Sequence, residues 1–193
     1  ISACLVGSEM CIRDRTNGVP VTIEDGLDAG MNSDTAKSLR KAMLRGVWHP
    51  ECKRCHDEEA SGMRSMRGLY EERWGKRFTL EDAQKITDPK TGEVPKDHKP
   101  FFYDIQLGNL CNLKCRMCGP SASSSWYKDA INPRSGGVID YYTNNNKMWE
   151  DLENFLPHIE DVYFAGGEPF VQDGHYKLID KLISSGHSKN VSL

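Results

Sequence analysis

The chain has 193 residues, of which 38% are hydrophobic and 27% are charged, a balance typical of a soluble globular protein and not of a disordered one. Its 25 basic and 28 acidic residues give a net charge of −3, which excludes a global basic field that would attract nucleic acid or an anionic membrane. No apolar run approaches the roughly 20 residues that a membrane helix needs.

The cysteines of the chain number seven, and five of them occur in two tight clusters. Cys52 and Cys55 form the first cluster, and Cys111, Cys115 and Cys118 form the second. An odd number in this grouping is typical of ligand sets, not of a disulfide framework, and it indicates a reducing compartment. We therefore expect a cytoplasmic protein.

The first residues of the chain resemble a sequencing artefact. The run from Leu5 to Asp14 back-translates into a string that resembles a transposase adapter used in sequencing libraries. A segment of foreign origin has no part in the fold, so we expect residues 1–15 to carry no structural meaning. The alternative interpretation is a genuine N-terminal strand that contains Cys4 and Val6.

A small, mainly helical domain is expected over residues 16–83. Asn32 or Ser33 can cap a helix that continues to about Arg45, where a glycine is placed to end it. The alternating charges of the stretch 64–77 are typical of a solvated helical face. The apolar residues expected to face inward on the first helix are Ala36, Leu39, Met43 and Leu44.

Residues 84–100 are predicted to form a linker, because Pro89, Pro95 and Pro100 interrupt any helix there. In residues 101–193, strands and helices are expected to alternate, an order typical of parallel βα units. The expected elements are a strand at 101–107, a helix at 123–130, loops over 132–146, a helix at 147–158, a strand at 161–165, a helix at 175–185 and the start of a strand at 191–193.

The cysteines Cys111, Cys115 and Cys118 have the spacing C-x3-C-x2-C, directly after the first of these strands. Three thiolates so close in sequence can wrap one corner of a cuboidal iron–sulfur cluster, for which thiolates are the usual ligands. A 4Fe–4S cube normally has four ligands, so three leave one iron open to a reacting molecule, as in catalytic zinc sites. The alternative is a zinc site that pairs Cys115 and Cys118 with Cys52 and Cys55. Their separation far exceeds the roughly 15–20 residues between the halves of a zinc ribbon.

A second motif, the turn Gly166-Gly167-Glu168-Pro169, follows the second predicted strand, where ligands usually bind in parallel βα folds. Two glycines let a ligand approach the backbone closely. The carboxylate and the carbonyls of the turn can accept hydrogen bonds from an ammonium group. A Gly-Gly pair alone is most often just a turn, so its weight comes from its place one βα unit after the cysteine loop.

Together the two motifs resemble the radical S-adenosylmethionine (SAM) superfamily over residues 101–193. The resemblance implies an α/β fold, the opening strands and helices of a partial (β/α)6 barrel. It also implies that Cys111, Cys115 and Cys118 ligate a 4Fe–4S cluster, and that Gly166, Gly167 and Glu168 hold the amino group of SAM.

The chemistry that the resemblance implies is reductive cleavage of SAM, chelated to the open iron, into methionine and a 5′-deoxyadenosyl radical that abstracts hydrogen from a substrate. A reductant such as flavodoxin or ferredoxin is implied as a partner. In the family, the residue before the last cysteine is usually aromatic and packs near the adenine. Here it is Met117, whose thioether can fill the same space.

The first cysteine pair resembles the N-terminal part of proteins described as twitch-domain radical SAM proteins, which implies an auxiliary iron–sulfur cluster with further ligands elsewhere. Zinc ligation, haem attachment through Cys-Lys-Arg-Cys-His and two reduced thiols are the other interpretations of this pair. The residues that carry the resemblance are the run from Trp48 to Cys55 with Glu58, Glu59, Gly62, Ser65 and Arg67.

We therefore predict a radical SAM enzyme with a twitch-like domain, acting on an unknown substrate for which a peptide is one candidate. Because only three barrel strands are expected, we interpret the chain as a fragment that makes little 5′-deoxyadenosine alone. The rival functions are a non-catalytic zinc-binding module and a simple iron–sulfur electron carrier. Neither nucleic acid nor a membrane is expected as a partner, since only the stretch 64–77 would support nucleic-acid binding.

Overall fold

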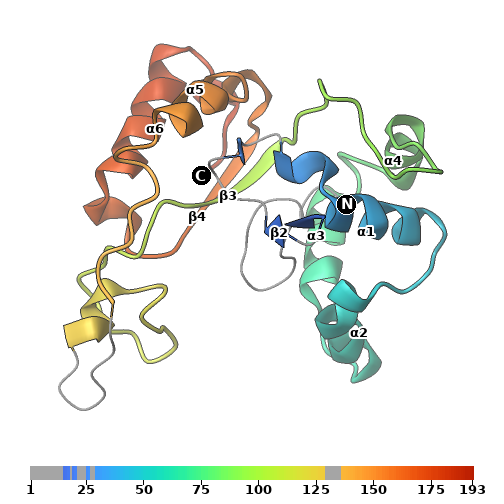
Figure 1. Cartoon of the computed structure of the whole chain (residues 1–193), viewed down its shortest axis with the longest axis horizontal. Coiled ribbons are helices and arrows are strands. Elements are labelled where there is room, and N and C mark those ends of the chain that lie inside the picture. The colour runs from blue at the N-terminus through green and yellow to red at the C-terminus, as the bar shows by residue number, and fades with distance from the viewer. Residues whose placement is uncertain (1–14, 18, 21–24, 27–28, 129–135) are drawn as a thin grey trace. The chain divides into compact units, whose positions relative to one another are not determined.

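The computed structural model describes residues 15–17, 19–20, 25–26, 29–128 and 136–193, so most of the segment expected to be an artefact lies outside the described residues. The chain divides into two compact units, Ile1–Lys99 and Pro100–Leu193, and each is described by itself (Figure 1). In the described ranges, no helix combines the length and apolar character needed to span a membrane.

The first unit consists mainly of short helices. A two-stranded antiparallel ladder precedes them, with Arg15 opposite Pro20 and Thr16 opposite Val19. Its elements in chain order are β1 (Arg15–Thr16), β2 (Val19–Pro20), η3 (Ala29–Asn32), α1 (Asp34–Leu44), η4 (Pro50–Cys52), α2 (Lys53–Ala60), α3 (Met66–Trp74) and α4 (Leu80–Ile86).

Helix α1 confirms the helix predicted from its capping signal. The Ser33 hydroxyl accepts a hydrogen bond from the Ala36 amide at 3.1 Å, which satisfies one of the amides left open at the helix start. Ala36 and Leu39 are buried as expected. Gly46 follows the helix with φ +64°, a left-handed conformation that glycine adopts without steric cost.

The segment 84–100, expected to be a linker, begins within α4 and then packs against α1. Helix α4 starts with a capping box, in which the side chains of Thr79 and Asp82 each accept a hydrogen bond from the other's backbone amide. After the helix, the carboxylate of Asp88 accepts hydrogen bonds from the amides two and three residues further on, which closes a turn. Val94 lies buried at the end of this turn.

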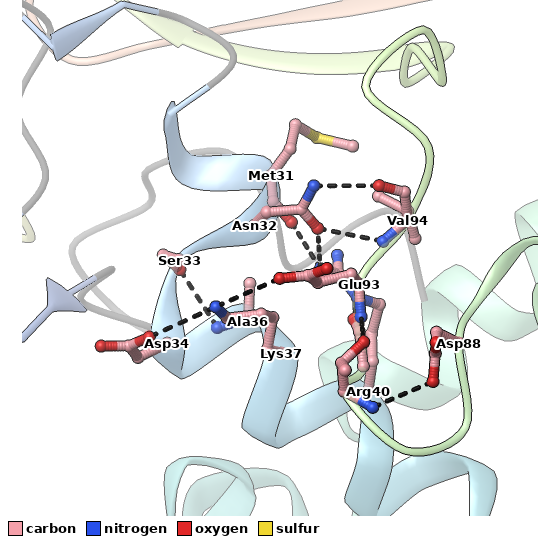
Figure 2. A network of polar contacts seen from close by, with 12 residues as sticks. Met31, Asn32, Ser33, Asp34, Ala36, Lys37, Arg40, Asp88, Glu93 and Val94 are labelled. Atoms are coloured by element: carbon pink, nitrogen blue, oxygen red, sulfur yellow. Dashed lines mark hydrogen bonds and ion pairs between the residues drawn. The ribbon is translucent and has the colours of Figure 1, made fainter.

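A polar network attaches this turn to α1, and Figure 2 shows the Asn32 side chain between Val94 and Arg40. The Asn32 carboxamide donates to the Val94 carbonyl at 2.9 Å and accepts from the Val94 amide at 3.0 Å. The buried Arg40 guanidinium donates to the carbonyls of Gly92 at 2.8 Å and Met31 at 2.5 Å, and to the Asn32 oxygen at 3.0 Å. Backbone oxygens thus compensate for the burial of a cation.

The second unit contains a parallel pair of strands with helices on one face. Strands β3 and β4 pair in register from Phe102 opposite Asp161 to Gln106 opposite Ala165. Ser192 continues the sheet by a parallel bridge to Asp161. The elements are β3 (Phe102–Gln106), η5 (Ser124–Lys128), α5 (Asn146–Glu153), η6 (Leu156–His158), β4 (Asp161–Ala165), η7 (Pro169–Val171), α6 (Asp173–Ser184) and η8 (Ser188–Asn190).

The crossover helix and the helix after β4 lie on the same side of the strands (Figure 1). Tyr103 packs edge to face against Phe155, which follows α5, with ring centroids 5.9 Å apart. Phe164 packs edge to face against His175 of α6 at 4.4 Å. Parallel strands with covering helices occur in βα barrels and in other parallel α/β folds alike, so the (β/α)6 barrel stays a prediction.

Three expected helices differ from the observed elements. The predicted helix at 147–158 ends at Glu153, because Pro157 has no amide to donate and its ring would clash with the carbonyl four residues back. The helix expected at 123–130 is a 3-10 turn within the described residues. The helix expected at 175–185 begins two residues earlier, at Asp173, and its buried stripe contains His175, Leu178 and Leu182, whereas Tyr176 and Ile183 are 48% and 59% exposed.

Candidate functional site

The three clustered cysteines lie on the loop that follows β3. Cys111 is partly buried, whereas Cys115 and Cys118 are exposed, and none of the three is in a disulfide. The Cys118 amide donates to the Cys115 carbonyl at 3.0 Å, which closes a turn between them. No group of three or more His, Cys, Asp or Glu side chains is gathered at metal-binding distance in the ranges that the structure describes.

The serines that follow this loop hold its first part in place. Ser123 donates from its hydroxyl to the Leu113 carbonyl at 2.6 Å, and Ser125 donates to the Cys111 carbonyl at 2.7 Å. The Ser124 hydroxyl accepts from the Cys111 amide at 3.3 Å. The hydroxyls of these serines thus fix the backbone on both sides of Cys111.

Asn109 is a residue of this site that the sequence pattern did not indicate. Its side chain is fully buried, and its amide group donates to the carbonyls of Pro120 at 3.0 Å and Gly137 at 3.2 Å. Its carboxamide oxygen accepts from the Ile139 amide at 2.6 Å. The Asn109 side chain therefore joins the two ends of the cysteine loop to residues 137–139. An asparagine three residues after the strand, next to a glycine, is the signal that could have indicated this role.

The Gly-Gly-Glu-Pro turn follows β4 and contacts the cysteine loop. The Gly167 amide donates to the Ala122 carbonyl at 2.8 Å, and the Glu168 amide donates to the Leu110 carbonyl at 2.9 Å. Because β3 and β4 are parallel and adjacent, the loops after them emerge at the same edge of the sheet. The structure thus brings the two motifs together.

Both glycines of the turn have left-handed backbones, with φ +68° at Gly166 and +64° at Gly167. A Cβ on Gly167 would lie 2.5 Å from the Leu110 carbonyl oxygen and 2.6 Å from the side-chain amide nitrogen of Gln172. That amide, on an almost fully buried side chain, donates to the Gly166 carbonyl at 3.1 Å. Glycine is therefore required both by conformation and by the close approach of the cysteine loop.

The carboxylate of Glu168 accepts a hydrogen bond from the Phe170 amide at 3.3 Å, at the start of the short helix η7. His175 packs next to this turn: its ring contacts that of Phe164, and its centroid lies 5.4 Å from that of the Phe170 ring. Burial lowers the pKa of His175, and the nearby Glu168 carboxylate opposes this effect in part. Burial of the imidazole therefore disfavours its protonated form.

The remaining predicted site residues are Met117, Cys52 and Cys55. Met117, expected to pack near an adenine, is 97% exposed. Cys52 and Cys55 belong to the first unit, at the beginning of α2, and both are partly buried. The guanidinium of Arg67 has a raised pKa, chiefly because it is paired with Glu59, and the two cysteines contribute in the same direction.

No family model, curated protein or solved structure matches the chain.

Proposed function

We propose that the chain is part of a radical SAM enzyme, with a 4Fe–4S cluster on Cys111, Cys115 and Cys118 and with SAM bound between this loop and the Gly166–Glu168 turn. The observation that carries the proposal is the pair of backbone hydrogen bonds from Gly167 and Glu168 to the cysteine loop. They join a triple-thiol motif to a glycine-carboxylate turn at one edge of a parallel sheet.

The donor set fits an iron–sulfur cluster. Three thiols on one loop are soft ligands of the type that such clusters select. Two of them are exposed and can move toward a common centre, while the hydroxyls of Ser123 and Ser125 hold the backbone near Cys111. When bound, the cluster supplies an electron for the cleavage of SAM.

The turn fits the amino-acid portion of SAM. Because Gly167 has no side chain, the turn lies directly against the Leu110 carbonyl of the cysteine loop, and Glu168 provides a partly buried carboxylate for an ammonium group. Gln172 donates a hydrogen bond to the Gly166 carbonyl, and His175 packs against Phe170. These contacts hold the backbone of the turn before a ligand binds. These residues would bind and orient SAM.

The test is anaerobic reconstitution of the full chain with iron and sulfide, followed by measurement of both and of SAM binding by equilibrium dialysis. We expect iron and sulfide in the ratio of a 4Fe–4S cluster and SAM binding that requires the cluster. Cys111→Ser, Cys115→Ser and Cys118→Ser should each abolish the uptake of that cluster.

The matched control is the double variant Cys52→Ser/Cys55→Ser, which removes two thiols from the other unit and should still bind SAM. A loss of the SAM-binding cluster in this control, with retention in Cys115→Ser, would overturn the assignment. A cluster that forms without binding SAM would favour the simple electron carrier, and zinc in place of iron would favour the zinc-binding module.

A further inference from the structure

The two faces of the β3–β4 pair differ in chemistry. Residues opposite each other in a parallel register point to the same side, so Tyr103 and Phe164 lie on the face that packs against the helices. The opposite face carries Asp104, Gln106 and Tyr163, with the buried Phe102 and Asp161 at its beginning and Ala165 at its end. Parallel strands are usually apolar on both faces, so polar residues at this position require an explanation.

The polar residues form a row that leads to the glycine turn. The Gln106 side chain occupies the space of a Gly166 Cβ, with its amide nitrogen 2.5 Å from that position. Asp104 lies two residues before Gln106 on the same face, about 7 Å further down the strand. Tyr163 is paired with Asp104 across the ladder, about 5 Å away in backbone position, and its side chain is more than half exposed.

Asp104 has a partly buried carboxylate, and its burial is what shifts its pKa. Desolvation raises its pKa, because the charged form loses water without gaining a compensating partner. Within the described residues, no hydrogen bond or ion pair reaches its carboxylate. Such a group is destabilising unless a ligand compensates it, and groups of this kind occur preferentially at binding sites.

We propose that Asp104 and Tyr163 form the substrate wall beside the SAM site and that they bind an organic ammonium group of the substrate. The carboxylate supplies charge and hydrogen-bond acceptors, and the neighbouring phenol ring supplies the face on which alkylammonium groups are attracted. Gln106 connects this wall to the turn. The location of the wall beside SAM rests on the proposed function, whereas the ammonium site itself depends only on these strands.

The test uses propylammonium as the probe and the full chain without cluster or SAM. The ¹³C signal of the Asp104 carboxyl group, assigned by its loss in Asp104→Asn, is followed during titration. We expect a saturable shift with propylammonium and none with propanol at the same concentration and ionic strength. Tyr163→Leu should weaken binding by about threefold, as expected for a lost cation–π contact.

Asp104→Asn should weaken propylammonium binding by about tenfold or more, which can be measured by calorimetry because the carboxyl signal is then gone. The same variant should still bind the cluster and SAM after reconstitution, since Asp104 is not among their ligands. Equal binding in Asp104→Asn, or a shift that sodium chloride reproduces, would overturn the inference. If the reconstituted chain bound neither the cluster nor SAM, the proposed function would be refuted. The propylammonium titration would remain interpretable, because it uses the chain without cluster or SAM.

Discussion

A methyl group on Gly167 should separate the two loops of the candidate site. The left-handed backbone costs a residue with a Cβ about 1–2 kcal/mol. The new Cβ would also lie 2.5 Å from the Leu110 oxygen, so the backbone must shift and strain the hydrogen bonds to Leu110 and Ala122. Each such bond contributes about 0.5–1.5 kcal/mol, so Gly167→Ala should lower the free energy of unfolding by about 2–5 kcal/mol in total.

The control for this prediction is Gly186→Ala at the end of α6. Gly186 also has a left-handed backbone, with φ +78°, but no atom lies within 4 Å of the position that a Cβ would take. The Gly186→Ala variant should therefore lose only the free energy that the left-handed backbone conformation costs, about 1–2 kcal/mol. The effect of the glycine-to-alanine change on the unfolded chain is common to both variants and cancels.

Urea unfolding of the full chain, followed by circular dichroism, measures the difference between these two variants. Gly167→Ala should also weaken SAM binding after reconstitution, whereas Gly186→Ala should leave it unchanged. Equal losses of stability in the two variants, with normal SAM binding in both, would refute the close approach of the turn to the cysteine loop.

Three further substitutions test the supports of the two units. Asn109→Ala removes three hydrogen bonds from a fully buried side chain, and it should lower the free energy of unfolding by about 2–4 kcal/mol and reduce iron retention after reconstitution. Arg40→Met leaves buried carbonyls without donors and should cost about 2–4 kcal/mol in urea unfolding, whereas the exposed Arg45→Met should change stability by less than about 0.5 kcal/mol. Burial lowers the pKa of His175, so below about pH 6.5 the unfolded chain binds a proton that the folded chain does not. Stability should therefore decrease as the pH falls from about 7 to 5, and His175→Phe should remove that part of the decrease.

Each of these three expectations has an opposing result. If the Asn109→Ala variant had the same midpoint of urea unfolding as the unsubstituted chain, the cysteine loop would be held by other contacts. Equal costs for Arg40→Met and Arg45→Met would contradict the burial of the guanidinium. An unchanged pH dependence in His175→Phe would mean that water reaches the imidazole in the folded chain.

Local signals predicted the elements that depend on local contacts. Ser33 and the apolar positions after it predicted α1, and the short apolar run 161–165 predicted β4. The helix at 147–158 was too long because its apolar periodicity outweighed Pro157, although a proline inside a helical pattern predicts an end one turn earlier. These predictions depended on neighbours in sequence, for which the pattern is informative.

The candidate site could be predicted only in part for the opposite reason. The spacing of the cysteines and glycines identified the two loops, but not the hydrogen bonds that join Gly167 and Glu168 to the residues before and after the cysteines. The roles of Asn109 and Ser123 depend on carbonyls 10 to 28 residues away, which no local pattern specifies. The polar face with Asp104 became evident only from the strand register.

The central proposal is tested most directly by electron paramagnetic resonance of the anaerobically reconstituted, reduced chain, recorded with and without SAM. We predict a 4Fe–4S signal that shifts when SAM is added and is absent in Cys115→Ala, because the cysteine loop and the glycine turn bind one cluster and one ligand. A signal that is indifferent to SAM, or a signal that survives in Cys115→Ala, would contradict the account.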